Sequence, residues 1–289
     1  MQLDLKSSYI NVNGVQHYYE WIKTPSQDQK KPVMVFLHGW GGSGRYWTST
    51  AQALSDQFDC LIYDLRGFGR SKARAIEESS FPVLSYELVD YAHELKGVLD
   101  ALNLEKVYLN AHSMGGSIAA LFLNLYPERV ERAVFTCSGI FEYDEKTFTT
   151  FHKFSRYVVL FRPKWLAKIP LADKVFMARF LHRSLPTSVS KAFLEDFLLA
   201  DFDAAYGTVL TSVSKEATEW LPQQFSQFTV PTLLVAGEYD QIIPAEMGRQ
   251  AAALNDKIEL AILENTAHFP MLEDAPTYLE RVREFINNH

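Results

Sequence analysis

The sequence of 289 residues lacks three features that mark whole classes of protein: a positive charge balance, a long apolar run and abundant cysteine. Lys and Arg total 28 against 35 Asp and Glu, which argues against general nucleic-acid binding, because that function needs a basic surface. No apolar run approaches the ~20 residues that span a bilayer. The first residues lack the basic and apolar regions of a secretory signal. We therefore expect a cytoplasmic protein that binds no nucleic acid.

Cysteine is scarce, and both copies, Cys60 and Cys137, lie in strand-like runs. This favours buried free thiols in a reducing compartment, although a disulfide between them stays open. No cluster of His, Cys, Asp or Glu has the spacing of metal ligands, so we expect no metal. Apolar residues make up 47% of the chain, which excludes disorder as its main state.

Short apolar runs alternate with helical patterns along most of the chain. Strands are predicted at residues 7–12, 15–22, 33–37, 60–63, 107–109, 133–137, 232–236 and 258–263. Asn13-Gly14 predicts a tight hairpin turn between the first two, because both residues tolerate positive φ. Strands that are apolar on both faces and alternate with helices predict an α/β fold with a mostly parallel, doubly wound sheet.

Residues 141–215 break the alternation with a helical, aromatic pattern that contains no convincing strand. We expect a helical cap inserted after one strand of a core made of residues 1–140 and 216–289. Between Lys153 and Lys191 the chain has nine basic residues and a single acid, Asp173. This pattern suggests transient contact with an anionic membrane surface, and the alternative is a solvated face balanced by acidic flanks.

A serine lies at the junction of a predicted strand and a predicted helix, where residues 109–116 read Leu-Asn-Ala-His-Ser-Met-Gly-Gly. A sharp turn there projects the Ser113 hydroxyl above the sheet edge and places the next N–H at a helix N-terminus, which can bind negative charge. Small residues two positions before and after the serine let strand and helix approach. The common pattern has Gly at both, and here the first is Ala111. A plain Ser/Gly turn is the alternative to a nucleophile.

A serine nucleophile needs a base, and the base needs an orienting acid. His268 follows the last predicted strand, and Asp240 follows the strand before it. Each is ambiguous alone, since a loop histidine is often a surface residue and Asp240 could cap a helix near Ala245. The chain order Ser113, Asp240, His268, each just beyond a strand, predicts a catalytic triad.

Glycines follow the predicted strand at 33–37, where residues 38–44 read His-Gly-Trp-Gly-Gly-Ser-Gly. A phosphate-binding loop is the competing interpretation, but its Gly-Lys-Ser/Thr ending is absent, and the dinucleotide-binding spacing is not met. A glycine-rich bend at residues 38–44 can instead direct the Trp40 N–H toward the Ser113 hydroxyl. We predict that the N–H groups of Trp40 and Met114 form an oxyanion hole.

These motifs resemble the α/β-hydrolase superfamily, specifically its lid-bearing branch of carboxylesterases, lipases and haloperoxidase-like enzymes. The resemblance covers nearly the whole chain apart from the insertion and rests on residues 38–40, 64–71, 112–116, 237–240 and 267–270. It implies about eight strands, a helical cap over the site, and acyl transfer to water without a cofactor.

Three positions separate the chain from other branches that this resemblance includes. Ser113 stands where epoxide hydrolases and haloalkane dehalogenases carry an aspartate, and Gly41 where perhydrolase-like members tend to have proline. Phe269 stands where carbon–carbon bond hydrolases often have tryptophan. The resemblance therefore favours hydrolysis of a carboxylic ester.

The substrate is expected to be a small-molecule, apolar ester, with a medium or long acyl chain or another lipophilic group held by the cap. Candidate substrate-binding residues are Trp40, Phe141, Phe154, Trp165 and Phe269, and the alternative is that the aromatic side chains pack the cap onto the core. A ligand receptor or signalling hydrolase with slow or single turnover stays open, as do carbon–carbon, lactone and thioester substrates. The protein is expected to be a monomer or a homodimer.

Overall fold

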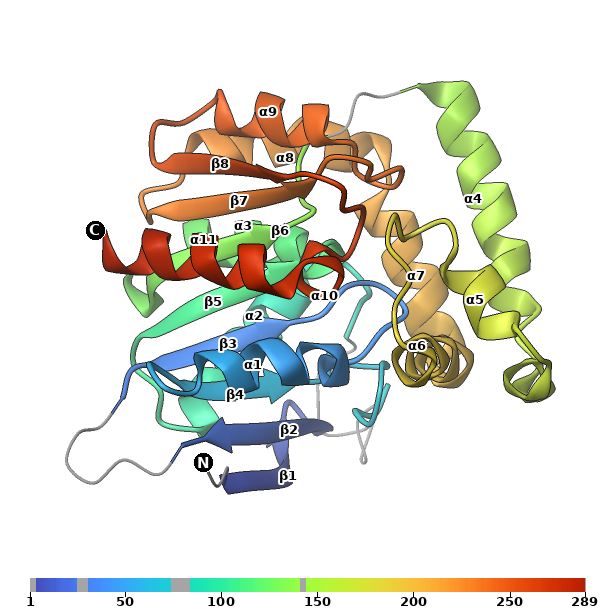
Figure 1. Ribbon diagram of the computed structural model, residues 1–289, viewed down its shortest axis with the longest axis horizontal. Helices are drawn as coiled ribbons and strands as arrows, with labels where there is room; N and C mark the ends of the chain where they lie inside the picture. Colours follow the sequence, from blue (N-terminus) through green and yellow to red (C-terminus); the bar gives the residue numbers. More distant parts are fainter. Residues whose placement is uncertain (1–3, 25–30, 74–83, 141–143, 289) are drawn as a thin grey trace.

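The computed structural model of the chain describes residues 4–24, 31–73, 84–140 and 144–288. One sheet has the order β1-β2-β4-β3-β5-β6-β7-β8 (Figure 1). Its strands are β1 (Asp4–Val12), β2 (Val15–Lys23), β3 (Val33–Leu37), β4 (Asp59–Tyr63), β5 (Val107–His112), β6 (Val130–Thr136), β7 (Thr232–Gly237) and β8 (Ile258–Leu263). β2 pairs antiparallel with β1 and β4, and the other neighbours pair in parallel. The predicted mostly parallel α/β sheet is confirmed.

The predicted hairpin forms between β1 and β2. Asn13 and Gly14 have φ values of 51° and 81°, and Val12 lies opposite Val15 in the register. The Gly14 N–H also donates to the Asn11 side-chain oxygen at 2.9 Å. The turn therefore follows from two residues that accept left-handed φ.

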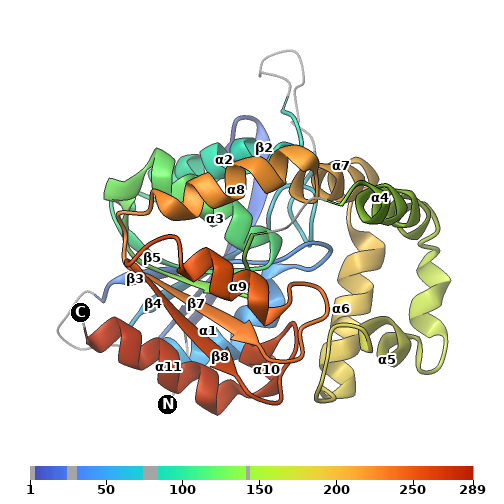
Figure 2. The same ribbon diagram turned by 90° about the horizontal axis from the view of Figure 1, so that it is seen from above.

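Helices cover both faces of the sheet (Figure 2). In the core they are η1 (Gly44–Trp47), α1 (Thr48–Leu54), α2 (Leu88–Ala101), α3 (Met114–Leu125), η3 (Pro127–Arg129), α8 (Lys215–Ser226), α9 (Ala245–Ala252), α10 (Pro270–Glu273) and α11 (Ala275–Asn287). α1 and α11 lie on one face, and α2, α3, α8 and α9 on the other.

The central strand β3 is apolar and buried at every position, so it contributes apolar side chains to both faces of the sheet. In β3, Val33, Val35 and Leu37 pack in the cluster that includes α2 and α3, whereas Met34 and Phe36 pack in the cluster that includes α1 and α11. Successive side chains of a strand point to opposite faces, so a continuous apolar run serves two cores at once.

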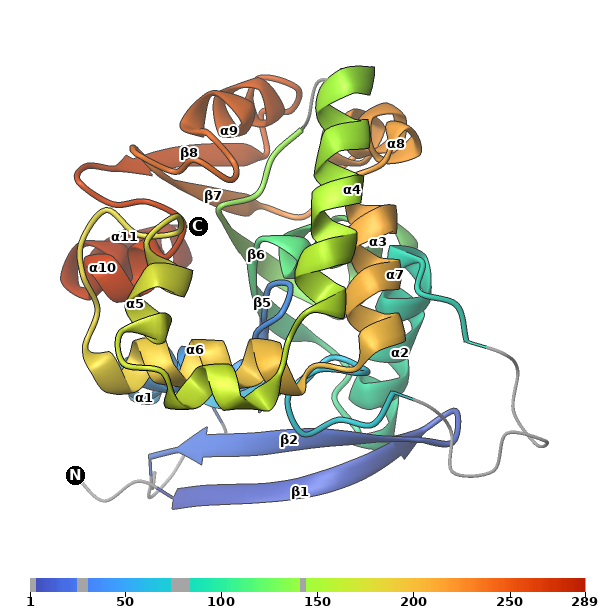
Figure 3. The same cartoon turned by 90° about the vertical axis from the view of Figure 1, so that its right-hand side faces the viewer.

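In the part of the chain that the structure describes, the segment between β6 and β7 contains helices and no strand. Before α8 these are α4 (Glu145–Leu160), η4 (Lys164–Lys168), α5 (Ala172–Met177), α6 (Thr187–Leu199) and α7 (Phe202–Ser212), which we call the insertion. The insertion lies over the carboxyl ends of the parallel strands (Figures 1 and 3). α8 instead packs against α3 on the core. The boundaries 141–215 of a cap domain stay a prediction.

Two further expectations concern the membrane and the thiols. None of the described helices is long and apolar enough to cross a bilayer. Cys60 and Cys137 are both buried and free, so the two thiols form no disulfide.

Candidate active site

Ser113 occupies the turn between β5 and α3 with φ 53° and ψ −121°. Non-glycine residues rarely adopt this conformation, which costs about 1–3 kcal/mol and persists only where the surroundings hold it. The glycines that follow explain how α3 comes so close to the segments just after β3 and β6. A Cβ on Gly115 would lie 2.7 Å from the His38 carbonyl oxygen, and one on Gly116 would lie 2.7 Å from the Ser138 hydroxyl.

The structure brings the three predicted triad residues into one chain of hydrogen bonds. His268 Nε2 lies 3.1 Å from Ser113 Oγ, and His268 Nδ1 lies 2.7 Å from Asp240 Oδ2. The other carboxylate oxygen, Oδ1, accepts the N–H groups of Ile242 and Ile243 at 2.8 and 3.1 Å. With the carboxylate accepting from Nδ1–H, the second ring nitrogen faces the serine as a proton acceptor.

The Asp240 carboxylate is buried, yet it stays ionised. Burial raises the pKa of Asp240, but the adjacent His268 and the amides of Ile242 and Ile243 lower it by more, so the net shift is downward. A buried anion at this place can stabilise an imidazolium on His268. The alternative role as a helix cap is wrong, because α9 begins at Ala245 with Pro244 as its N-cap.

The acid loop and the histidine loop run side by side at the carboxyl ends of β7 and β8. A Cβ on Gly237 would lie only 1.9 Å from the Ala267 carbonyl oxygen. The Tyr239 N–H donates to the Thr266 carbonyl at 2.9 Å. A residue without a side chain at position 237 is therefore what lets the two loops meet.

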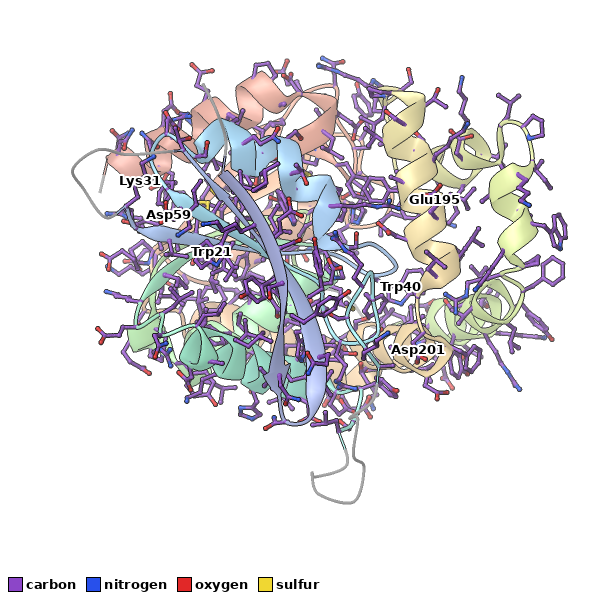
Figure 4. All side chains as sticks on the ribbon, turned by 90° about the horizontal axis from the view of Figure 1, so that it is seen from below. Trp21, Lys31, Trp40, Asp59, Glu195 and Asp201 are labelled. Carbon is purple, nitrogen blue, oxygen red and sulfur yellow. The ribbon has the colours of Figure 1, made fainter. Side chains whose placement is uncertain are left out.

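The loop that carries Trp40 passes directly beside the serine. A Cβ on Gly39 would lie 3.1 Å from Ser113 Cβ. The Trp40 side chain points toward the insertion (Figure 4), where its Nε1–H donates to the Ala205 carbonyl at 2.8 Å and its ring packs 5.6 Å from the Phe197 ring. Met114 is the first residue of α3. Both backbone N–H groups named for the oxyanion hole thus belong to segments next to Ser113.

The predicted substrate-binding residues are only partly brought together. The Phe269 ring lies 5.5 Å from the His268 ring. Trp165 is 54% exposed, and its neighbour Leu166 packs against α6 in its place, so its inclusion in the pocket is not supported. Phe141 and the side chain of Phe154 lie outside the described part of the structure.

A model of the α/β hydrolase fold family matches residues 32–275. The chain belongs to this family. An uncharacterized hydrolase of Bacillus subtilis is 24% identical over 285 residues, which cover 96% of each chain.

Solved structures of related enzymes superpose on this α/β-hydrolase. A putative lipase from Acinetobacter baumannii has a TM-score of 0.78 at 21% identity, covering 98% of this chain and 91% of its own. An esterase from Exiguobacterium antarcticum has a TM-score of 0.78 at 20% identity, covering 97% and 99%. At these identities the likeness shows the shared fold only. The substrate of this hydrolase must be inferred from its own residues.

Tyr46 and His112 form a buried pair that supports the site, a role that the sequence motifs did not predict. Tyr46 Oη accepts the Gly39 N–H at 2.6 Å and lies 2.8 Å from His112 Nδ1. His112 Nε2 lies 2.7 Å from the His268 carbonyl oxygen, which can only accept, so Nε2 carries the hydrogen. Burial lowers the pKa of His112 well below its usual value, which keeps the ring neutral.

Glu273 is a second supporting residue. Its Oε1 accepts the N–H groups of Ala267 and Phe269 at 2.9 and 3.2 Å, on either side of the histidine. Its Oε2 accepts the N–H groups of His182 and Arg183 in the insertion at 2.7 and 2.8 Å. The only signal in the sequence was an acid at the end of the otherwise apolar run 269–272.

Other bonds tie the insertion to the core around the same site. The His268 N–H donates to the Phe180 carbonyl at 3.0 Å. Asp196 of α6 accepts from the Ser43 hydroxyl at 2.8 Å and from Arg45 Nε at 2.9 Å. The loops that carry the proposed base and oxyanion hole are therefore both held by the insertion.

One group of potential metal ligands occurs among the described residues, formed by His112, Cys137 and His268 with ligand atoms within 4.8 Å of one another. Burial raises the pKa of the Cys137 thiol well above its usual value, so the sulfur stays protonated. Both ring nitrogens of His112 are hydrogen-bonded. Metal ligation needs a thiolate and a free ring nitrogen, so these residues do not fit a metal site.

Proposed function

We propose that this α/β-hydrolase cleaves carboxylic esters with a lipophilic acyl or alcohol group, through an acyl-enzyme on Ser113. The observation that carries the proposal is the hydrogen-bonded chain Ser113–His268–Asp240, with distances of 3.1 and 2.7 Å. The strained backbone of Ser113 adds support, because it is maintained at a cost in stability.

The proposed reaction has two halves. His268 Nε2 takes the proton of Ser113 Oγ as this oxygen attacks the ester carbonyl carbon, and the N–H groups of Trp40 and Met114 bind the oxyanion. The intermediate collapses, and the alcohol leaves with the proton from His268. Water, deprotonated by His268, then attacks the acyl carbon, and the acid departs as Ser113 regains its proton. Asp240 stabilises the imidazolium in both halves.

Aromatic rings around the base support an apolar substrate. The Phe180 ring lies 6.1 Å from the His268 ring, and the rings of Phe176 and Phe197 lie 4.9 Å apart. Sites lined by aromatic groups with a few polar atoms suit lipophilic ligands. The free buried thiols favour a reducing compartment, so we propose that the enzyme acts in the cytoplasm.

The test is hydrolysis of p-nitrophenyl esters from acetate to palmitate by the wild type and by Ser113→Ala. We expect repeated turnover by the wild type and a loss of at least about 10³-fold in kcat for the variant. A fluorophosphonate probe, located by mass spectrometry, reports activation of Ser113 independently of the ester. Labelling without ester turnover would reject the substrate class and keep the nucleophile, whereas an active Ser113→Ala would reject the nucleophile.

A further inference from the structure

The outer surface of the insertion exposes an unusual group of apolar side chains. Seven large ones lie within residues 157–175, and we call them the outer strip: Tyr157, Leu160, Phe161, Trp165, Ile169, Leu171 and Val175. Val175 is 76% exposed and Phe161 is 70% exposed. They lie in α4, η4 and α5 or in the residues directly next to these helices, which face the viewer in Figure 3. Single exposed apolar residues are ordinary, but such a concentration marks an interaction surface.

The exposed charges within this segment are all positive. Lys164, Lys168 and Lys174 are exposed and lie between members of the strip, and the exposed Arg156 directly precedes it. Asp173, the one acid between residues 153 and 191, is only 4% exposed. Between residues 153 and 191 the protein therefore exposes apolar and positively charged side chains, with no exposed acid among them.

A hollow beside the strip adds to this positive surface. A cavity of about 390 Å³ is lined by Lys168, Lys174 and Lys191, together with Ile169 and Leu171 of the strip. The same cavity contains Asp173, so its lining carries three cations and one anion. A lipid phosphate would meet a net positive charge there, directly next to apolar side chains.

We propose that the outer strip docks the protein on an anionic lipid bilayer. The apolar side chains enter the boundary between headgroups and acyl chains, and the lysines meet the lipid phosphates. Charge complementarity selects this partner, because a bilayer that contains anionic lipid is negative over its whole surface and the exposed charges between residues 153 and 191 are all positive. Docking does not rest on the proposed chemistry, so Ser113→Ala is expected to bind vesicles as the wild type does.

The test is flotation of the full chain with vesicles of phosphatidylcholine alone or mixed with phosphatidylglycerol. Binding is expected with phosphatidylglycerol only and is expected to weaken at high salt, since salt screens exposed charges. Absence of binding to the anionic vesicles at low salt, or equal binding to both compositions, overturns the proposal.

Two variants locate the surface. In Lys164→Gln/Lys168→Gln/Lys174→Gln, affinity should fall roughly fivefold for each cation, on the order of a hundredfold in all. Phe161→Ser/Val175→Ser should also weaken binding. The control Leu254→Ser/Lys257→Gln changes an exposed apolar residue and an exposed cation outside the insertion, and should bind normally.

Circular dichroism checks that every variant is folded, and turnover of a short soluble ester adds a second check for the strip variants and their control. Vesicle binding that is the same in the wild type and in both strip variants contradicts the proposed surface. A second copy of the chain is the competing occupant. A dimer in size-exclusion chromatography that Phe161→Ser/Val175→Ser dissociates, with no vesicle binding, rejects the bilayer.

Discussion

His112 Nε2 lies 2.7 Å from the main-chain carbonyl oxygen of His268, so the residue before the proposed nucleophile holds the loop of the proposed base. The other ring nitrogen meets Tyr46, whose hydroxyl also accepts the Gly39 N–H. One buried chain of hydrogen bonds thus joins the nucleophile, the base and the loop of the oxyanion hole. The polar atoms of both side chains bond to Gly39, to each other and to the His268 carbonyl, so Tyr46 and His112 act as positioning residues.

Tyr46→Phe is predicted to lower kcat on a soluble ester roughly tenfold with little change in KM, because small misplacements of reacting groups slow chemistry more than binding. It should also lower the free energy of unfolding by about 1–3 kcal/mol, since it leaves the Gly39 N–H and His112 Nδ1 without a partner. Tyr63→Phe is the control, because that buried hydroxyl has no hydrogen-bond partner among the described residues. Equal effects of the two variants on kcat would argue against positioning.

Glu273→Gln is predicted to reduce both kcat and stability. The new NH₂ group would face two backbone N–H donors, so the side chain would keep only part of its four bonds. Loss of bonds to a buried charge costs about 1.5–3 kcal/mol in unfolding free energy. Urea titration and steady-state kinetics measure the two effects. Glu284→Gln, which removes only an exposed pair with Arg281, should stay within about 0.5 kcal/mol of the wild type.

Two glycine-to-alanine substitutions are predicted to have opposite signs. Gly237→Ala forces a methyl group against the Ala267 carbonyl, so it should lower the unfolding free energy by about 1–3 kcal/mol and reduce activity by separating Asp240 from His268. Gly248→Ala meets no atom closer than 3.6 Å in α9, so it should raise stability by about 0.5–1 kcal/mol. Thermal unfolding of both variants measures these changes. Wild-type stability and activity of Gly237→Ala would refute the close approach of the two loops.

Because His17 is buried, we expect the protein to lose stability in mild acid. Burial lowers the pKa of His17 from 6.5 to about 4, with a further contribution from the charge of Arg66, while Glu94 lies 3.9 Å away. Above pH 6.5 both folded and unfolded states hold a neutral ring, and the contribution to stability is complete. Between pH 6.5 and 4 the His17 ring is protonated in the unfolded chain but stays neutral in the folded chain. The free energy of unfolding therefore falls by up to about 3 kcal/mol.

His17→Gln should remove this share of the acid dependence, measured by urea unfolding at a series of pH values. The buried rings of His38 and His112, whose pKa values burial also lowers, continue to contribute in the variant. His93→Gln is the control, because that side chain lies at the surface. An unchanged slope in His17→Gln would show that another group produces the acid dependence.

Local patterns were enough to predict the strands, the Asn13-Gly14 turn and the grouping of Ser113, Asp240 and His268. Apolar runs flanked by turn residues identify strands without knowledge of the fold, and parallel strands carry their carboxyl ends to one edge of a sheet. Residues that directly follow those strands must then lie near one another. The distances of 3.1 and 2.7 Å among these three predicted triad residues agree with that expectation.

The tertiary structure alone decided which aromatic residues face the site and which polar residues support it. Helical spacing did not distinguish Trp165, which is exposed, from its neighbour Leu166, which packs against α6. His112 and Glu273 looked like isolated polar residues, because their partners are backbone groups of loops distant in the chain. Nearly every residue has the same backbone donor and acceptor, so the sequence does not indicate which side chain will bind them. The contacts form only when the loops and the insertion pack on the sheet.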